Sequence, residues 1–180
     1  MPHIQLPEGL PGITSGFAFR PETAKPMREL AEILLRGPNT LTSAEREMIA
    51  AFVSSLNDCH FCQASHSAAA AHHLGGNYTL VDAVKCDYPN APVSDKLKAL
   101  LAIAAKVQQS GKDVTGSDVE CARAGGASDR EIHDTVLIAA AFCMFNRYVD
   151  GLATMTPNDP VIYDVMGQRM AHEGYVRPTA

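Results

Sequence analysis

Four side chains stand at spacings that could support chemistry: Glu47, Cys59, Cys62 and His66. The cysteines form a Cys-x-x-Cys pair, and the histidine follows the second cysteine by four residues. Thiols at this spacing can exchange with a disulfide, bind a metal ion, or pack as small hydrophobic side chains. A nearby imidazole and carboxylate could move protons to and from a thiol. Which of these applies depends on the elements that carry the four side chains.

A helix predicted over residues 59–74 places three of these side chains on one face. At about 100° per residue, Cys59 and His66 point within about 20° of each other, and Cys62 lies about 60° to one side. Asp58 is the predicted N-cap, so both cysteines fall in the first turn. Unpaired backbone N–H groups and the positive end of the helix dipole favour a thiolate there. His66 can then exchange a proton with a sulfur, directly or through water.

Glu47 is predicted on the preceding helix, which runs from Thr42 to Leu56. Thr42 and Glu45 form a capping box at its start. Its apolar side chains recur with the helical period, while the side that carries Glu47 is otherwise made of small residues. Small residues allow a second helix to approach closely. We expect Glu47 near this second contact, where it could act as a base or fix the His66 tautomer if it reaches the same pocket.

Helical periodicity and capping signals extend along most of the chain, and no segment shows the alternation of a strand. The other predicted helices cover residues 23–35, 79–86, 95–109, 115–125, 129–154 and 161–171. The predicted fold class is therefore all-α, a single-domain bundle of about six to eight helices. We divide the chain into an extended, proline-rich N-terminal arm at 1–21, a helical domain at 22–172 and a loose C-terminal tail at 173–180.

The composition argues against several classes of function. The chain of 180 residues has a net charge of −5 and no cluster of Lys and Arg, so nucleic acid is not an expected partner. No apolar run reaches transmembrane length, and residues 1–20 lack the pattern of a secretory signal, so we expect a cytoplasmic protein. Five cysteines, an odd number where thiols are kept reduced, argue against a disulfide framework. Cys86, Cys121 and Cys143 are interpreted as small hydrophobic residues.

Two interpretations of the motif remain open. In the first, the two cysteines form a redox dithiol with His66 and Glu47 as proton carriers, and no metal or other cofactor is expected. In the second, the protein is non-catalytic, and the cysteines and His66 bind structural zinc with Glu47 or another histidine as the fourth ligand. Structural zinc sites usually take a second ligand pair from elsewhere in the chain, and no such pair is evident. The sequence therefore favours the redox dithiol.

The motif also resembles that of a known family. Glu47, eleven further residues, and then the Cys-x-x-Cys-x-x-x-His stretch from Cys59 to His66 resemble the signature of AhpD-like alkylhydroperoxidases in the carboxymuconolactone decarboxylase superfamily. Segments 128–132 and 145–152 resemble the peroxidase-related subgroup. The resemblance covers roughly residues 22–160, which is most of the chain.

This resemblance implies an AhpD-like helical bundle that assembles as a homo-oligomer, namely a dimer, trimer or hexamer. It implies reduction of a small hydroperoxide, or delivery of electrons to a peroxiredoxin or similar partner, with a dithiol as a possible reductant. The cysteine pair would cycle between dithiol and disulfide, while Glu47 and His66 would relay protons. A decarboxylase reaction is a further alternative, but the decarboxylases of the superfamily lack the cysteine pair.

The sequence departs from the family pattern at one position. AhpD proper has a histidine immediately before the second cysteine, where this chain has Phe61. His60 is one position away and points elsewhere, about 100° from Cys59 around the helix. The proton relay is therefore incomplete by that pattern. The attacking cysteine stays open, because the helix dipole favours Cys59 and the geometry of the pocket could favour Cys62.

Overall fold

The structure is a computed structural model that describes residues 1–176 of the chain. Within this range it contains nine α-helices, one short 3₁₀ helix at Gly111–Asp113, and no strand. The α-helices are α1 (Ile13–Phe19), α2 (Pro21–Arg36), α3 (Ser43–Leu56), α4 (His60–His73), α5 (Tyr78–Asp87), α6 (Asp95–Gln109), α7 (Gly116–Ala124), α8 (Asp129–Gly151) and α9 (Pro160–Glu173). The predicted all-α fold is confirmed, with slightly more helices than the six to eight expected.

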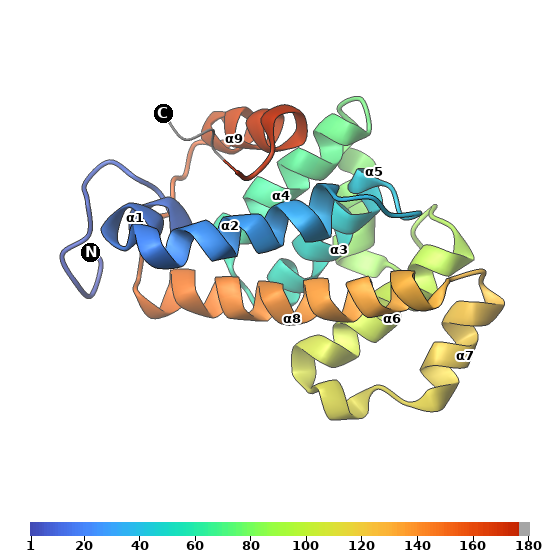
Figure 1. The fold of residues 1–180 in the computed structure, drawn as a ribbon. Helices are drawn as coiled ribbons and strands as arrows, with labels where there is room; N and C mark the ends of the chain where they lie inside the picture. The colour runs from blue at the N-terminus through green and yellow to red at the C-terminus, as the bar shows by residue number, and fades with distance from the viewer. Residues whose placement is uncertain (177–180) are drawn as a thin grey trace.

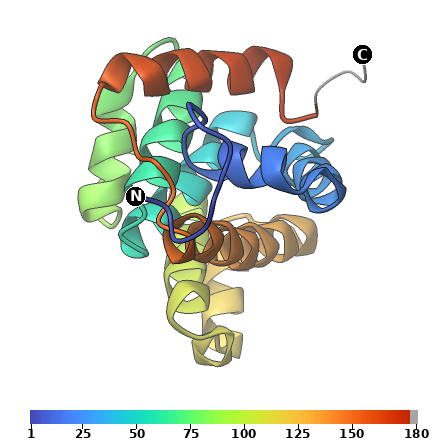
Figure 2. The ribbon, with the colours of Figure 1, turned by 90° about the vertical axis from the view of Figure 1, so that its left-hand side faces the viewer.

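The helices are arranged around α3 and α4 (Figure 1). α4 packs against α3 on one side and α9 on the other, and α3 also packs against α6 and α8. Figure 2 shows α9 across the top of the molecule, with α8, α6 and α7 toward the opposite side. The helix that follows the first cysteine is therefore enclosed between two other helices.

Three helices begin at capping boxes, each of which is a Ser or Thr followed three residues later by Glu or Asp. The boxes are Thr42–Glu45 at α3, Thr115–Asp118 at α7 and Ser128–Glu131 at α8. In each box the acidic side chain accepts a hydrogen bond from the backbone N–H of the capping residue. Each interaction satisfies a donor that a helix start leaves unpaired, so local sequence alone sets these three starting points.

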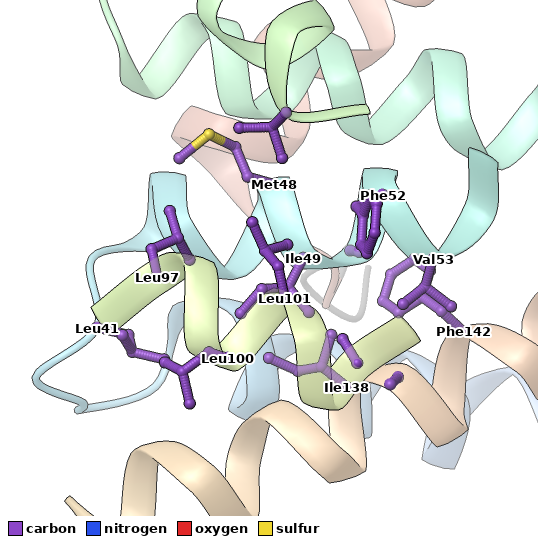
Figure 3. Packing of buried hydrophobic residues seen from close by; sticks show 14 of the residues in the cluster. Leu41, Met48, Ile49, Phe52, Val53, Leu97, Leu100, Leu101, Ile138 and Phe142 are labelled. Carbon is purple, nitrogen blue, oxygen red and sulfur yellow. The ribbon is translucent and has the colours of Figure 1, made fainter. Parts of the chain in front are cut away.

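α3 is buried on two sides, as its sequence predicts. One side meets α6 and α8 in the main core, where Figure 3 shows Ile49, Val53, Leu100, Leu101, Ile138 and Phe142 packed together. A buried aliphatic or aromatic side chain contributes about 1.5–3 kcal/mol through the loss of its contact with water. The other side carries Glu47, Ala51 and Ser54, all with 0% exposure. These residues allow α4 to approach, so Glu47 faces the helix of the cysteine motif.

Small residues also hold α9 close to α4. Gly167 of α9 packs against Ala68 and Ala69, and a Cβ at this glycine would overlap Ala68. Both alanines are buried almost completely. Because the backbones approach this closely, α9 forms one wall over the length of α4.

The N-terminal segment differs from the extended arm that was predicted. Residues 13–19 form α1, and the backbone N–H of Gly12 donates to the carbonyl of Met155 at 2.8 Å. The segment therefore packs on its own domain. α2 begins at Pro21 rather than Thr23, because a proline suits the first helical position, where no backbone N–H is needed.

The turn between α3 and α4 also differs from the prediction. Asp58 is not the N-cap but lies in the turn with a φ of 55°, a left-handed conformation that aspartate tolerates better than most residues. Cys59 is the N-cap, and its backbone N–H donates to the carbonyl of Ser54 at 3.0 Å. Cys59 therefore precedes the first turn of α4, whereas Cys62 lies within it.

The three cysteines outside the motif do not share one environment. Cys143 is buried, as expected of a small hydrophobic residue. Cys86 and Cys121 are exposed, which corrects the interpretation of both as core residues. Both lie on the outer sides of short helices, where a thiol has no packing role to fulfil.

Candidate active site

The two motif cysteines have different access to a cavity of about 780 Å³. Cys62 lines this cavity, although only 3% of it is exposed. Both thiols belong to a small apolar cluster with Phe61, Val149 and Tyr163, but Cys59 has 0% exposure and does not line the cavity. A molecule in the cavity therefore meets the sulfur of Cys62 first, with Cys59 behind it.

The electrostatic environment separates the two thiols in the same direction. A hydrogen bond from the Cys59 thiol lowers the pKa of Cys62, aided by His66 and the amide of Asn146, while burial opposes the shift. The same hydrogen bond and burial raise the pKa of Cys59. Cys62 is therefore the thiol of the pair that loses its proton more readily, and Cys59 is its hydrogen-bond donor.

This assignment predicts the pH dependence of alkylation at Cys62. Because the thiolate is the nucleophile and its pKa is lowered, Cys62 should keep reacting with iodoacetamide at pH values where free glutathione has lost its thiolate. Residue-resolved mass spectrometry across a pH series measures both midpoints in one mixture. A Cys62 midpoint at or above that of glutathione would contradict the assignment.

A buried polar network holds Asn146 beside Cys62. The Nδ2 group of Asn146 donates to Ser54 Oγ at 3.1 Å, and its Oδ1 accepts from Asn57 Nδ2 at 2.8 Å. Gln108 Nε2 in turn donates to Asn57 Oδ1 at 2.9 Å. These bonds fix which end of the Asn146 amide carries N–H, and so they direct a donor toward the sulfur of Cys62. Sequence reasoning assigned Asn146 no role, although a polar residue among the apolar positions of α8 was an available signal.

His66 and Glu47 form the second half of the site. His66 Nδ1 lies 2.8 Å from Glu47 Oε2, and Glu47 has 0% exposure. A carboxylate only accepts, so His66 carries its proton on Nδ1 and presents an unprotonated Nε2. The structure thus brings Glu47, Cys62 and His66 together as predicted from the sequence, with Cys59 directly behind.

Tyr175 is a further residue of the site, which the sequence did not indicate. Its hydroxyl donates to Glu47 Oε1, and its ring stacks on that of His66 with centroids 6.1 Å apart and an interplanar angle of 12°. Burial, with the charge of Glu47, raises the pKa of Tyr175 well above its usual range, so the phenol remains a donor. Glu47 therefore has both oxygens occupied, one by an imidazole and one by a phenol.

Tyr175 belongs to the segment that was predicted to be a loose tail. α9 ends at Glu173, and Gly174 then adopts a φ of 84°, which turns the chain back toward α2. The backbone N–H of Tyr175 donates to Glu32 Oε2 at 2.7 Å. The prediction is thus wrong for residues 174–176, which pack against the site, while residues 177–180 lie outside the described residues.

Tyr175→Phe is expected to lower the free energy of unfolding by about 1–3 kcal/mol, since a buried carboxylate oxygen loses its donor. Urea unfolding followed by circular dichroism measures the change. Tyr78→Phe is a matched control, because it removes a phenol that donates to the exposed Asp164, where water can replace it. Equal, small effects in the two variants would show that Tyr175 is not docked on Glu47.

Phe61 and His60 lie as the predicted helix phase requires. Phe61 is buried, lines the cavity, and meets the ring of Tyr163 edge-on at 6.0 Å. His60 is exposed, and its ring meets that of the same tyrosine edge-on, with centroids 5.7 Å apart. No proton-transfer group therefore stands at position 61, and Tyr175 reaches Glu47 and His66 from another direction.

The cavity itself is mostly apolar. It lies between α1, α2, α4, α8 and α9, and Tyr175 contributes to its wall. Its apolar side chains include Ile13, Phe17, Met27, Phe61, Phe142, Phe145, Met166 and Met170. A cavity of this volume and lining is typical of sites for small organic ligands.

Two further structural findings bear on the alternatives. Within residues 1–176, no three His, Cys, Asp or Glu side chains are grouped so that they could hold a metal ion. Glu47, which the zinc interpretation named with another histidine as a candidate fourth ligand, instead bonds to His66 and Tyr175. None of the helices in the described part of the chain combines the length and apolarity needed to cross a membrane.

Comparison with known proteins places this fold and site in a recognised group. A sequence model of the carboxymuconolactone decarboxylase family matches residues 21–77, a span that includes all four motif residues. An uncharacterized peroxidase-related protein from Silicibacter sp. TM1040 is 30% identical, with a TM-score of 0.77 over 86% of this chain and 78% of that one. An uncharacterized peroxidase-related protein from Ralstonia eutropha JMP134, with an alkylhydroperoxidase AhpD core, is 26% identical, with a TM-score of 0.78 over 88% and 82%. No curated protein matches the chain.

The fold therefore defines an AhpD-like helical protein of the peroxidase-related type. The chain belongs to the carboxymuconolactone decarboxylase superfamily, as the spacing from Glu47 to His66 suggested.

Proposed function

We propose that the protein is a thiol-dependent peroxidase that reduces organic hydroperoxides with the Cys59–Cys62 pair. The observation that carries this proposal is the position of Cys62, a thiol with a lowered pKa on the wall of an apolar cavity, with a protonated thiol directly behind it. An attacking thiolate needs access to the oxidant, and a resolving thiol needs only access to the first sulfur. Membership of the superfamily supports a role of this kind.

The reaction begins with transfer of the Cys62 proton to His66. The thiolate then attacks the terminal oxygen of the hydroperoxide, the O–O bond breaks, and the alkoxide takes the proton from His66 to leave as an alcohol. Cys62 is now a sulfenic acid. The Cys59 thiol attacks its sulfur, a disulfide forms, and the hydroxyl leaves with the Cys59 proton as water. Two thiols and one hydroperoxide thus give one disulfide, one alcohol and one water.

Glu47 stabilises His66 while it holds a proton. The carboxylate accepts from Nδ1 and fixes the tautomer, so Nε2 is the nitrogen that exchanges a proton with the sulfur and the leaving group. Tyr175 holds the second oxygen of Glu47 in place. This arrangement supports a relay that operates without a histidine at position 61.

A dithiol must return two electrons and two protons to the oxidised pair. We propose that this reductant is a small dithiol or a dithiol protein. Alternatively, the reduced pair passes its electrons on to a peroxiredoxin. We propose the cytoplasm as the location of either reaction.

We also propose that the protein forms a homo-oligomer, which is a dimer, trimer or hexamer. Its support is the outer side of α9, where Val161 and Val165 are 62% and 59% exposed beside Leu10, an apolar surface that a second copy could cover.

Thiol titration before and after one equivalent of cumene hydroperoxide tests the function, together with the metal content of the purified protein. We expect two thiols to be lost, both to return with dithiothreitol, and peptide mapping to join Cys59 with Cys62. Stoichiometric zinc with thiols that peroxide leaves unchanged would overturn the proposal and support the structural-zinc alternative.

A further inference from the structure

Arg169 stands on the cavity wall, and no acidic side chain among residues 1–176 pairs with it. Its Nε atom is buried and has no hydrogen-bond partner among residues 1–176, and its guanidinium takes part in no ion pair in that part of the chain. Other buried or half-buried arginines of the molecule are paired, since Arg36 bonds to Glu32 and Arg46 to the carbonyls of Leu34 and Gly37. An unsatisfied buried donor is costly, so this guanidinium is suited to receive an acceptor from a ligand.

The chemistry of Arg169 favours an anion as this acceptor. A guanidinium is always charged and can bind a carboxylate through two parallel N–H groups, so a carboxylate would satisfy both the charge and the buried Nε. Among the described residues that line the cavity, Arg28 is a second cation with contacts of its own, which include the Phe17 ring at 4.9 Å, and Glu173 is an exposed carboxylate. The anion site is therefore assigned to Arg169 alone.

The rest of the wall fits an apolar chain. Met27, Met166 and Met170 are flexible thioethers that adapt to ligands of different shape, and Phe61 and Phe142 stand beside Cys62 and His66. Arg169 and Met166 also line a shallower apolar groove outside, beside Leu10. Arg169 thus lies where the cavity meets the outer surface, the position at which the polar end of an amphipathic ligand is best placed.

We propose that the cavity selects hydroperoxides of amphipathic organic acids, with the carboxylate on Arg169 and the apolar chain along the wall that leads to Cys62. The inference rests on the proposed peroxidase function for the reaction and on the cavity alone for the binding. Reduction follows the steps given above, so a hydroperoxy acid leaves as the hydroxy acid and water.

Calorimetric titration with two unreactive probes tests the binding without any turnover. Decanoate and 1-decanol share a chain and differ in the carboxylate. We expect the reduced protein to bind decanoate about tenfold or more tightly than 1-decanol, and Arg169→Gln to weaken decanoate by about tenfold to a hundredfold. Arg169→Lys should keep part of the affinity, because it retains the charge but loses the fork geometry.

Arg130→Gln is the matched control, since it removes the same charge from an exposed side chain at the start of α8. Decanoate affinity should not change in this variant. Equal binding of the two probes, no binding of either, or the same loss in both arginine variants would overturn the inference. The thiol titration with cumene hydroperoxide, which has no carboxylate, reports on the peroxidase function separately, so a failure of the reaction and a failure of carboxylate binding give different results.

Discussion

Cys62→Ser is expected to reduce hydroperoxide consumption to the background rate, whereas Cys59→Ser is expected to leave one reaction per molecule. Cys62 is the thiol that lines the cavity and has the lowered pKa, so its loss removes the attacking atom. Cys59 acts only after the O–O bond is broken, so its loss should stop the protein at the sulfenic acid of Cys62. Trapping with dimedone and mass spectrometry after one equivalent of cumene hydroperoxide distinguishes these outcomes.

The exposed Cys86 supplies the control for this pair of variants. Cys86→Ser removes a thiol from the same protein without touching the cavity, and it should consume hydroperoxide as the unaltered chain does. If Cys59→Ser were inert and Cys62→Ser formed the sulfenic acid, the order of the two cysteines would be reversed. That result would mean that the helix N-terminus, rather than the cavity, decides which sulfur attacks.

The sequence could predict the helices because their signals are local. The boxes at Thr42, Thr115 and Ser128 involve residues three apart, so hydrogen bonds within one turn decide where α3, α7 and α8 begin. The start of α4 could not be predicted in the same way. Asp58 has the side chain of an N-cap, but the hydrogen bond from the Cys59 backbone to Ser54 moves the start of the helix by one residue.

The candidate site was predictable as far as it depends on helix periodicity and the family spacing. Cys62 and His66 share a face of α4, and the small residues beside Glu47 allow α3 to bring the carboxylate to His66. Tyr175 was not predictable, because it lies 128 residues after Glu47 in the chain and its segment has no regular structure. Only Gly174, which permits the turn at a positive φ, marked the place where the tail folds back.

The choice between the cysteines shows why geometry was needed. On a bare helix, the dipole favours the first cysteine, since it lies closer to the positive end. In the folded protein both thiols belong to one apolar cluster, but Cys59 has no exposure, whereas Cys62 lines the cavity with His66 and Asn146 beside it. Burial and hydrogen bonds act at contact distance, so they outweigh a dipole that both thiols share.

Glu47→Gln is expected to slow hydroperoxide reduction by about a hundredfold or more, the loss typical of impaired acid–base catalysis. Glutamine has the same size, but it offers one acceptor where Glu47 offers two, to His66 and to Tyr175. Either His66 or Tyr175 must then lose its acceptor and face the N–H₂ group of the glutamine. The negative charge that stabilises protonated His66 is also lost. Stopped-flow measurement of thiol oxidation under single-turnover conditions, across a pH series, gives the rate and its protonation profile.

Glu45→Gln is the control for this variant, since it alters a glutamate on the same helix that serves only the capping box with Thr42. It should leave the oxidation rate unchanged and cost about 1 kcal/mol or less of stability, because glutamine can also complete such a box. A role for Glu47 that is purely structural predicts lower stability with an unaltered pH profile. A role in proton transfer predicts a changed dependence of the oxidation rate on pH even when all of the protein is folded. Stability and rate must therefore be measured on the same preparations. An unchanged rate in Glu47→Gln would remove the carboxylate from the mechanism and leave His66 as the sole proton carrier.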